Sequence, residues 1–111
     1  MTTYNHITVE PVAGALGAEI SGVSVADELD AETIGEIRAA LLDHLVIFFR
    51  DQDLPVDRHK AFTRRFGDIF IHPNYQLGQE DRETVYLLRR PGDASVAGEN
   101  WHADTTMMET P

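Results

Sequence analysis

The sequence has no cysteine, few cations and no long apolar run, and each absence excludes a class of protein. Without cysteine there is no disulfide scaffold, thiolate zinc site or cysteine nucleophile. The chain has only 9 Lys and Arg residues against 19 Asp and Glu residues. The resulting net charge of −10 argues against a nucleic-acid binder. The longest strongly apolar run, residues 45–49, is far shorter than the roughly 20 residues that span a bilayer. The sequence therefore predicts a cytoplasmic protein without nucleic-acid or membrane partners.

The hydrophobic patterns along the 111 residues predict one domain at most, with a mixed α/β fold. A helix is expected over residues 31–44, because Asp30 is a suitable N-cap and apolar residues follow with the helical period. A second helix is expected from Pro55 to near Gly67. Residues 45–49 are typical of a strand covered on both faces. The buried stripe of the first helix is predicted to comprise Ile34, Ile37, Leu41, Leu42 and Leu45. Further short strands are expected at 7–10, 18–20, 69–71 and 84–88.

His102 and Asp104 form the first pair that could do chemistry. In an extended segment, residues two apart point to the same face, about 6.6 Å from each other along the chain. Ferrous oxygenases bind iron through two histidines and one carboxylate, so such a pair could supply two ligands. With 5 His and 19 acidic residues in 111, about one such spacing is expected by chance. Taken alone, the spacing more often marks a polar surface pair.

Four motifs in order resemble the taurine dioxygenase (TauD/TfdA) family. The C-terminal segment, NWHADTT followed by ETP at 109–111, resembles the family signature N-W-H-T-D-x-T-F-x-E-T-P. The upstream matches are GAEISG at 17–22, VIFFRDQ at 46–52, and RFGD at 65–68 followed by IHPNY at 71–75. Four matches that span nearly all of the chain are far more specific than one histidine–aspartate spacing.

The resemblance implies a non-haem dioxygenase that uses Fe²⁺ and 2-oxoglutarate. The implied fold is a double-stranded β-helix (jelly-roll) with a mainly β core and added helices. Residues 1–111 would be the N-terminal portion of a single catalytic domain that is incomplete at its C-terminus. His102 and Asp104 would be catalytic residues and two of the three iron ligands. The third ligand and the groups that bind 2-oxoglutarate are expected beyond Pro111.

His72, Tyr75 and Thr105 match family positions that contact substrate. An imidazole N–H, a phenol O–H and the backbone N–H of Thr105 are donors suited to the oxygens of an anion. The alternative for the first two is structural: Pro73 holds His72 extended, and Tyr75 only packs.

The implied reaction is hydroxylation of a small anion with O₂, with release of succinate and CO₂. Taurine or a related sulfonate, which would release sulfite, is the first expectation. Gly98 and Met107 differ from the residues of taurine dioxygenase at the matching positions, and these differences weaken the case for taurine as the specific substrate. An alkyl sulfate, an aryloxy acid or a carboxylated metabolite is the alternative, and a non-catalytic truncated relative is a third hypothesis. Self-association into a homo-oligomer is left open.

Overall fold

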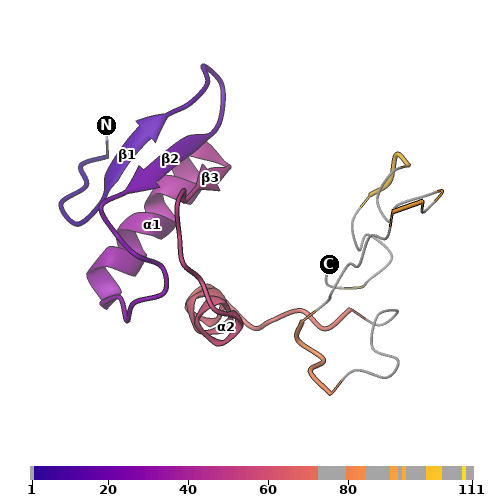
Figure 1. Ribbon diagram of the computed structural model, residues 1–111. Coiled ribbons are helices and arrows are strands. Elements are labelled where there is room, and N and C mark those ends of the chain that lie inside the picture. Colours follow the sequence, from indigo (N-terminus) through magenta and orange to yellow (C-terminus); the bar gives the residue numbers. More distant parts are fainter. Residues whose placement is uncertain are drawn as a thin grey trace. The chain divides into compact units, whose positions relative to one another are not determined.

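The structure is a computed structural model that describes residues 2–72, 80–84, 91–92, 94, 100–103 and 109. The chain divides into two compact units, Met1–Phe70 and Ile71–Pro111. The helices and strands seen among the described residues lie in the first unit (Figure 1). They are β1 (Thr8–Pro11), β2 (Ala18–Ser21), α1 (Ala31–His44), β3 (Ile47–Phe48) and α2 (Val56–Arg64). None of the helices in this described part is long and apolar enough to cross a membrane.

The three strands form one mixed sheet in the order β1–β2–β3. β1 and β2 are antiparallel, with Val9 opposite Ile20. β2 and β3 are parallel, with Ala18 opposite Ile47. A parallel pair needs a long connection between its strands, and α1 supplies it. The predicted mixed α/β character is confirmed for the first unit, and the strands expected at 7–10 and 18–20 are present within one residue of their predicted bounds.

Helix α1 confirms the predicted bounds of 31–44. The side chain of Asp30 accepts a hydrogen bond of 2.7 Å from the backbone N–H of Thr33, which satisfies one of the unpaired donors of the first turn. At the other end Leu45 takes a left-handed conformation with φ of 67°. Its N–H bonds the carbonyl of Leu41 at 2.8 Å and closes the helix.

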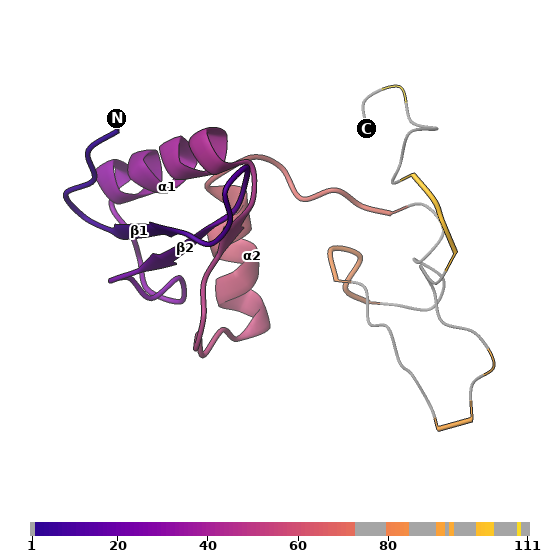
Figure 2. The same cartoon turned by 90° about the horizontal axis from the view of Figure 1, so that it is seen from above.

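The core lies between α1 and one face of the sheet (Figure 2). The buried core residues are Ile7, Ile20, Ile34, Ile37 and Ala40. The predicted stripe of α1 was too wide: Leu42 is 70% exposed and Leu45 is 66% exposed. Leu41 is also exposed, whereas Ala40 is buried. The side chains that face the sheet follow the narrow i, i+3, i+6 row from Ile34, and the leucines lie off this row.

Helix α2 attaches to the rest of the unit through aromatic contacts. The ring centroid of Phe62 lies 5.8 Å from that of Phe49 and 5.2 Å from that of Phe66, both in edge-on geometry. The helix begins at Val56, one residue later than predicted, so Pro55 is its N-cap, and no side chain makes a capping hydrogen bond there. The helix itself ends at Arg64, three residues before Gly67.

Two predicted strands differ from the structure. Of residues 45–49 only Ile47 and Phe48 pair, and Phe48 is 45% exposed, so this strand is not covered on both faces. The reason is that Leu45 and Val46 complete the exit from α1: the Val46 N–H bonds the carbonyl of His44 at 2.8 Å. Residues 69–71 form no strand, and the described residues supply no partner strand for them. The predicted strand at 84–88 lies, from residue 85 on, outside the described residues.

Candidate active site

His102 is the predicted iron ligand whose geometry the structure describes. Its Nδ1 lies 2.7 Å from the backbone carbonyl oxygen of Asn100. A carbonyl can only accept a hydrogen bond, so Nδ1 carries a proton and acts as the donor. Metal-binding histidines typically donate their second ring N–H in this way, which fixes the tautomer and the direction of the ring. The hydrogen bond to Asn100 therefore fixes the direction of the His102 ring.

The other predicted ligand and two of the substrate-binding residues, Asp104, Thr105 and Tyr75, lie outside the described residues. Within the described part, no group of three His, Asp or Glu side chains could hold a metal ion. His72 is described and half-buried, directly after the boundary between the two units. Trp101, which precedes His102, is fully exposed in the part of the chain that the structure describes.

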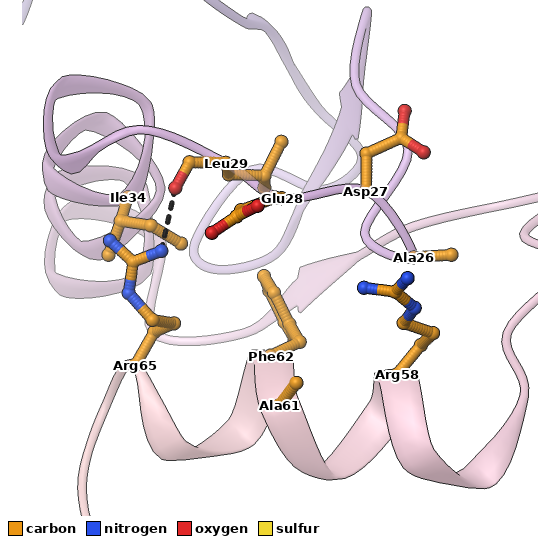
Figure 3. A pocket seen from close by; sticks show the side chains of 9 residues that line it. All are labelled: Ala26, Asp27, Glu28, Leu29, Ile34, Arg58, Ala61, Phe62 and Arg65. Carbon is orange, nitrogen blue, oxygen red and sulfur yellow. Dashed lines mark hydrogen bonds between the residues drawn. The ribbon is translucent and has the colours of Figure 1, made fainter.

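The first unit contains a cavity of about 250 Å³ that is not lined by any of these residues. It separates α2 from residues 26–29, and Figure 3 shows Arg58 and Arg65 at its two ends with Phe62 between them. Arg65 donates a hydrogen bond of 2.6 Å to the carbonyl of Leu29. The lining residues are Ala26, Asp27, Glu28, Leu29, Ile34, Arg58, Ala61, Phe62 and Arg65. Charges of both signs and no predicted ligand line this cavity, so it is not the candidate iron site.

Comparison with known proteins decides the family. The profile of the family described as "Taurine catabolism dioxygenase TauD, TfdA family" matches residues 8–111. The chain belongs to this family. The resemblance read from the four motifs is confirmed.

Two curated relatives and one solved structure show how far this TauD/TfdA chain extends. It is 39% identical over 105 residues to an alpha-ketoglutarate-dependent sulfate ester dioxygenase of Pseudomonas putida, which covers 94% of this chain and 34% of the relative. It is 30% identical over 115 residues to an alkylsulfatase of Acinetobacter baylyi, covering 98% of this chain and 35% of the relative. The crystal structure of a taurine dioxygenase from Burkholderia xenovorans aligns with a TM-score of 0.66 and 36% identity, over 76% of this chain and 30% of that one. The chain thus spans about a third of the length of the relatives it matches.

Two of the TauD/TfdA motifs, at 17–22 and 46–52, meet in the fold. Glu19 lies opposite Phe48 in the parallel pair, so Arg50, two residues further, falls on the same face as Phe48. Arg50 Nε donates a 2.6 Å hydrogen bond to Glu19 Oε2. This contact with the Glu19 carboxylate raises the pKa of Arg50.

Gln52 completes this polar junction between the two motifs. Its Oε1 accepts a hydrogen bond of 2.8 Å from the N–H of Val25, and its Nε2 donates one of 2.9 Å to the carbonyl of Arg50. The sequence alone did not predict this junction. A glutamate in β2 and an arginine two residues after β3 point to the Glu19–Arg50 contact only once the register of the two strands is known. The junction supports the fold and contains none of the predicted iron ligands.

Proposed function

We propose that the protein carrying this chain is an Fe²⁺- and 2-oxoglutarate-dependent dioxygenase that hydroxylates a small organic anion. The observation that supports the proposal is the family signature around His102 in a TauD/TfdA chain, matched over residues 8–111. Within that signature the His102 Nδ1 lies 2.7 Å from the Asn100 carbonyl oxygen, a contact that directs the ring of a metal-binding histidine. When bound, iron and 2-oxoglutarate would activate O₂, so that one oxygen atom converts a C–H bond of the substrate to C–OH and the other enters succinate as CO₂ is released.

The chain's own residues would divide the work. His102 and Asp104 would supply two of the three protein ligands of the iron, and the open positions would take 2-oxoglutarate and O₂. His72, Tyr75 and the backbone N–H of Thr105 would donate hydrogen bonds to the anionic group of the substrate and so place its C–H bond for attack. The third ligand and the residues that bind 2-oxoglutarate would come from the part of the protein outside this chain. In that arrangement residues 1–111 are the N-terminal portion of one jelly-roll domain.

For the substrate we propose a sulfate ester or a sulfonate. The first of the curated relatives is named for sulfate esters and the second is an alkylsulfatase, which supports the alkyl sulfate alternative alongside taurine. Hydroxylation of the carbon that bears the sulfate oxygen gives an unstable adduct, which collapses to an aldehyde and sulfate. Hydroxylation beside a sulfonate releases sulfite in the same way.

The test uses the full-length protein with Fe²⁺, 2-oxoglutarate and O₂. Succinate formation is measured with hexyl sulfate, taurine and a phenoxypropionate as separate substrates, and released sulfate or sulfite is measured in parallel. We expect substrate-dependent succinate with one of the two sulfur anions, in equal amount to the released sulfur anion. His102→Ala should abolish it, whereas His59→Ala, at an exposed histidine of α2, should not. Lack of substrate-dependent succinate with all three would favour the non-catalytic alternative.

A cytoplasmic location and self-association stay predictions, which fractionation and light scattering would test.

A further inference from the structure

Residues 2–6 lie along α1 and are held there by carboxylates on one face of that helix. Glu32, Glu36 and Asp43 share this face, because they are separated by four and seven residues. Each carboxylate contacts a residue of the 2–6 segment. The segment is therefore fixed by electrostatic contacts before the chain enters β1.

Glu36 is the centre of this attachment. Its Oε1 accepts a hydrogen bond of 2.8 Å from the N–H of Asn5, and its Oε2 accepts one of 2.9 Å from the N–H of His6. The Glu36 side chain is only 15% exposed. Desolvation would raise the pKa of Glu36, but these two N–H groups and the His6 side chain outweigh it and lower the pKa to about 2. Glu36 is thus ionised at every pH at which the protein would work.

Both ring nitrogens of His6 face carboxylates. Nδ1 lies 2.9 Å from Glu36 Oε1, and Nε2 lies 3.4 Å from Glu32 Oε2. Ionised carboxylates can only accept, and a neutral imidazole has a single N–H, so both contacts are attractive only when His6 is an imidazolium. In the neutral ring the Nε2 lone pair would instead face the Glu32 oxygen and repel it.

The far end of the segment closes a second cavity. Thr2 and Tyr4 donate hydrogen bonds through their hydroxyl groups to Asp43 Oδ2, the latter at 3.1 Å. The cavity, of about 370 Å³, lies between the segment, β1 and the end of α1. Its lining residues are Thr2, Tyr4, Val9, Pro11, Asp43 and His44. Any loosening of residues 2–6 would therefore widen this cavity.

We propose that residues 2–6 form a proton-operated clasp, in which the imidazolium of His6 joins the segment to Glu32 and Glu36 and the neutral imidazole releases Glu32. The charged groups that face His6 are Glu32, Glu36 and the N-cap Asp30, all acidic. The Thr2 and Tyr4 hydroxyls lower the pKa of Asp43, while desolvation and Asp43 raise that of Tyr4. His44, at the end of α1, also faces Asp43 and lines the second cavity. His6 is the titratable group of the clasp whose ring lies between two carboxylates.

The sign of the effect follows from the two pKa values. The Glu36 hydrogen bond, together with the nearby carboxylates, raises the pKa of His6 above its usual 6.5. The stabilisation that the His6 imidazolium gives to the attached segment is therefore complete below pH 6.5 and is lost as pH rises through the raised pKa. The pKa of Glu36 is lowered, so its contribution is complete above its usual 4.5 and is lost only as pH falls towards about 2. The clasp is strongest between about pH 4.5 and 6.5.

Hydrogen exchange of the full-length protein tests the clasp. Deuterium uptake of the peptide that contains residues 2–7 is measured from pH 5 to 8.5 and divided by the unfolded-chain rate at each pH. We expect protection to be constant up to about pH 6.5 and to fall above it. A pKa difference of one unit between the closed and open segment corresponds to about a tenfold fall. Protection of a peptide from α1 serves as the internal reference.

Three variants separate the clasp from a general effect of pH. His6→Gln should give low protection without a pH-dependent fall, because glutamine does not titrate. Glu32→Gln should move the fall to lower pH, since it removes one acceptor of the imidazolium. His59→Gln removes a histidine that lies outside the clasp and should behave like the wild type. The clasp is refuted if wild-type protection is constant from pH 5 to 8.5, or if the fall persists in His6→Gln.

Discussion

The two units of the chain carry different kinds of information. In residues 2–70, periodic apolar residues, a capped helix and a three-stranded sheet account for the fold. In residues 71–111 the described part holds no helix or strand, and the recognisable feature is the family signature around His102. The comparison teaches that, among the described residues, the regular secondary structure and the proposed iron ligand lie in separate stretches of this sequence. We therefore expect substitutions in residues 2–70 to change the free energy of unfolding, and substitutions at the proposed site residues in 71–111 to change the rate of the proposed reaction.

The largest effect is expected at the signature. His102→Ala in the full-length protein should abolish 2-oxoglutarate turnover, because the remaining ligands cannot hold iron in the required geometry. The melting temperature of the metal-free protein should stay close to that of the wild type, since the His102 side chain is exposed. Succinate production and calorimetry measure the two quantities. Unchanged succinate production would contradict the ligand assignment.

The next largest effect is expected from a substitution that creates a cavity in the core of the first unit. Ile37 is fully buried, so Ile37→Ala should lower the free energy of unfolding by about 2–5 kcal/mol. Leu42→Ala removes a similar volume from the exposed side of the same helix and should cost less than about 0.5 kcal/mol. Urea unfolding of both variants gives the comparison. Turnover per folded molecule should be unchanged in each, and a selective loss of kcat in Ile37→Ala would show that the two units are coupled.

A smaller effect is expected from His72, at the boundary between the units. If its imidazole bonds the anionic group of the substrate, losing a charge-assisted hydrogen bond of about 1.5–3 kcal/mol should raise the substrate KM roughly 10–150-fold. The KM for 2-oxoglutarate should stay constant, because His72 is not assigned to that co-substrate. Steady-state kinetics of His72→Ala, with His59→Ala as the matched control, measures both. An unchanged substrate KM would leave His72 with only the structural role of a turn.

The smallest effect is expected from the cap of α1. Asp30→Ala removes the hydrogen bond to the Thr33 N–H and should lower Tm by roughly 2–4 °C at neutral pH. The Thr33 backbone N–H lowers the pKa of Asp30, so this stabilisation exists above the usual value of 3.8 and is lost as pH falls below it. The Tm difference from wild type should therefore shrink at pH 3. Asp27→Ala, which removes a nearby carboxylate outside the cap, should leave Tm unchanged at both pH values.

The sequence was sufficient for features that depend on local pattern. The bounds of α1 follow from Asp30 and from the recurrence of Ile34 and Ile37, which the structure confirms. Features that depend on distant contacts were missed. The exposure of Leu42 and the junction of Arg50 with Glu19 depend on how β2, α1 and β3 pack, and no neighbouring residue specifies that.

The candidate site also combines a feature that the sequence could identify with features that depend on the folded chain. The family resemblance identifies His102, and neither composition nor periodicity could have done so. The tautomer of His102 depends on one carbonyl, that of Asn100, whose direction is a property of the folded backbone rather than of residue types. Asp104, Tyr75 and Thr105 stay predictions.

The parallel pairing of β2 with β3 also bears on how the chain folds as it is made. Ala18 pairs with Ile47, 29 positions later, so this contact must wait until all of α1 has left the ribosome, whereas the β1–β2 hairpin closes over a much shorter loop. Synthesis adds about 5–20 residues per second, so several seconds separate Ile47 from His102. Because parallel pairing across a helix is slow relative to hairpin closure, this interval gives the first unit time to assemble before the family signature is translated.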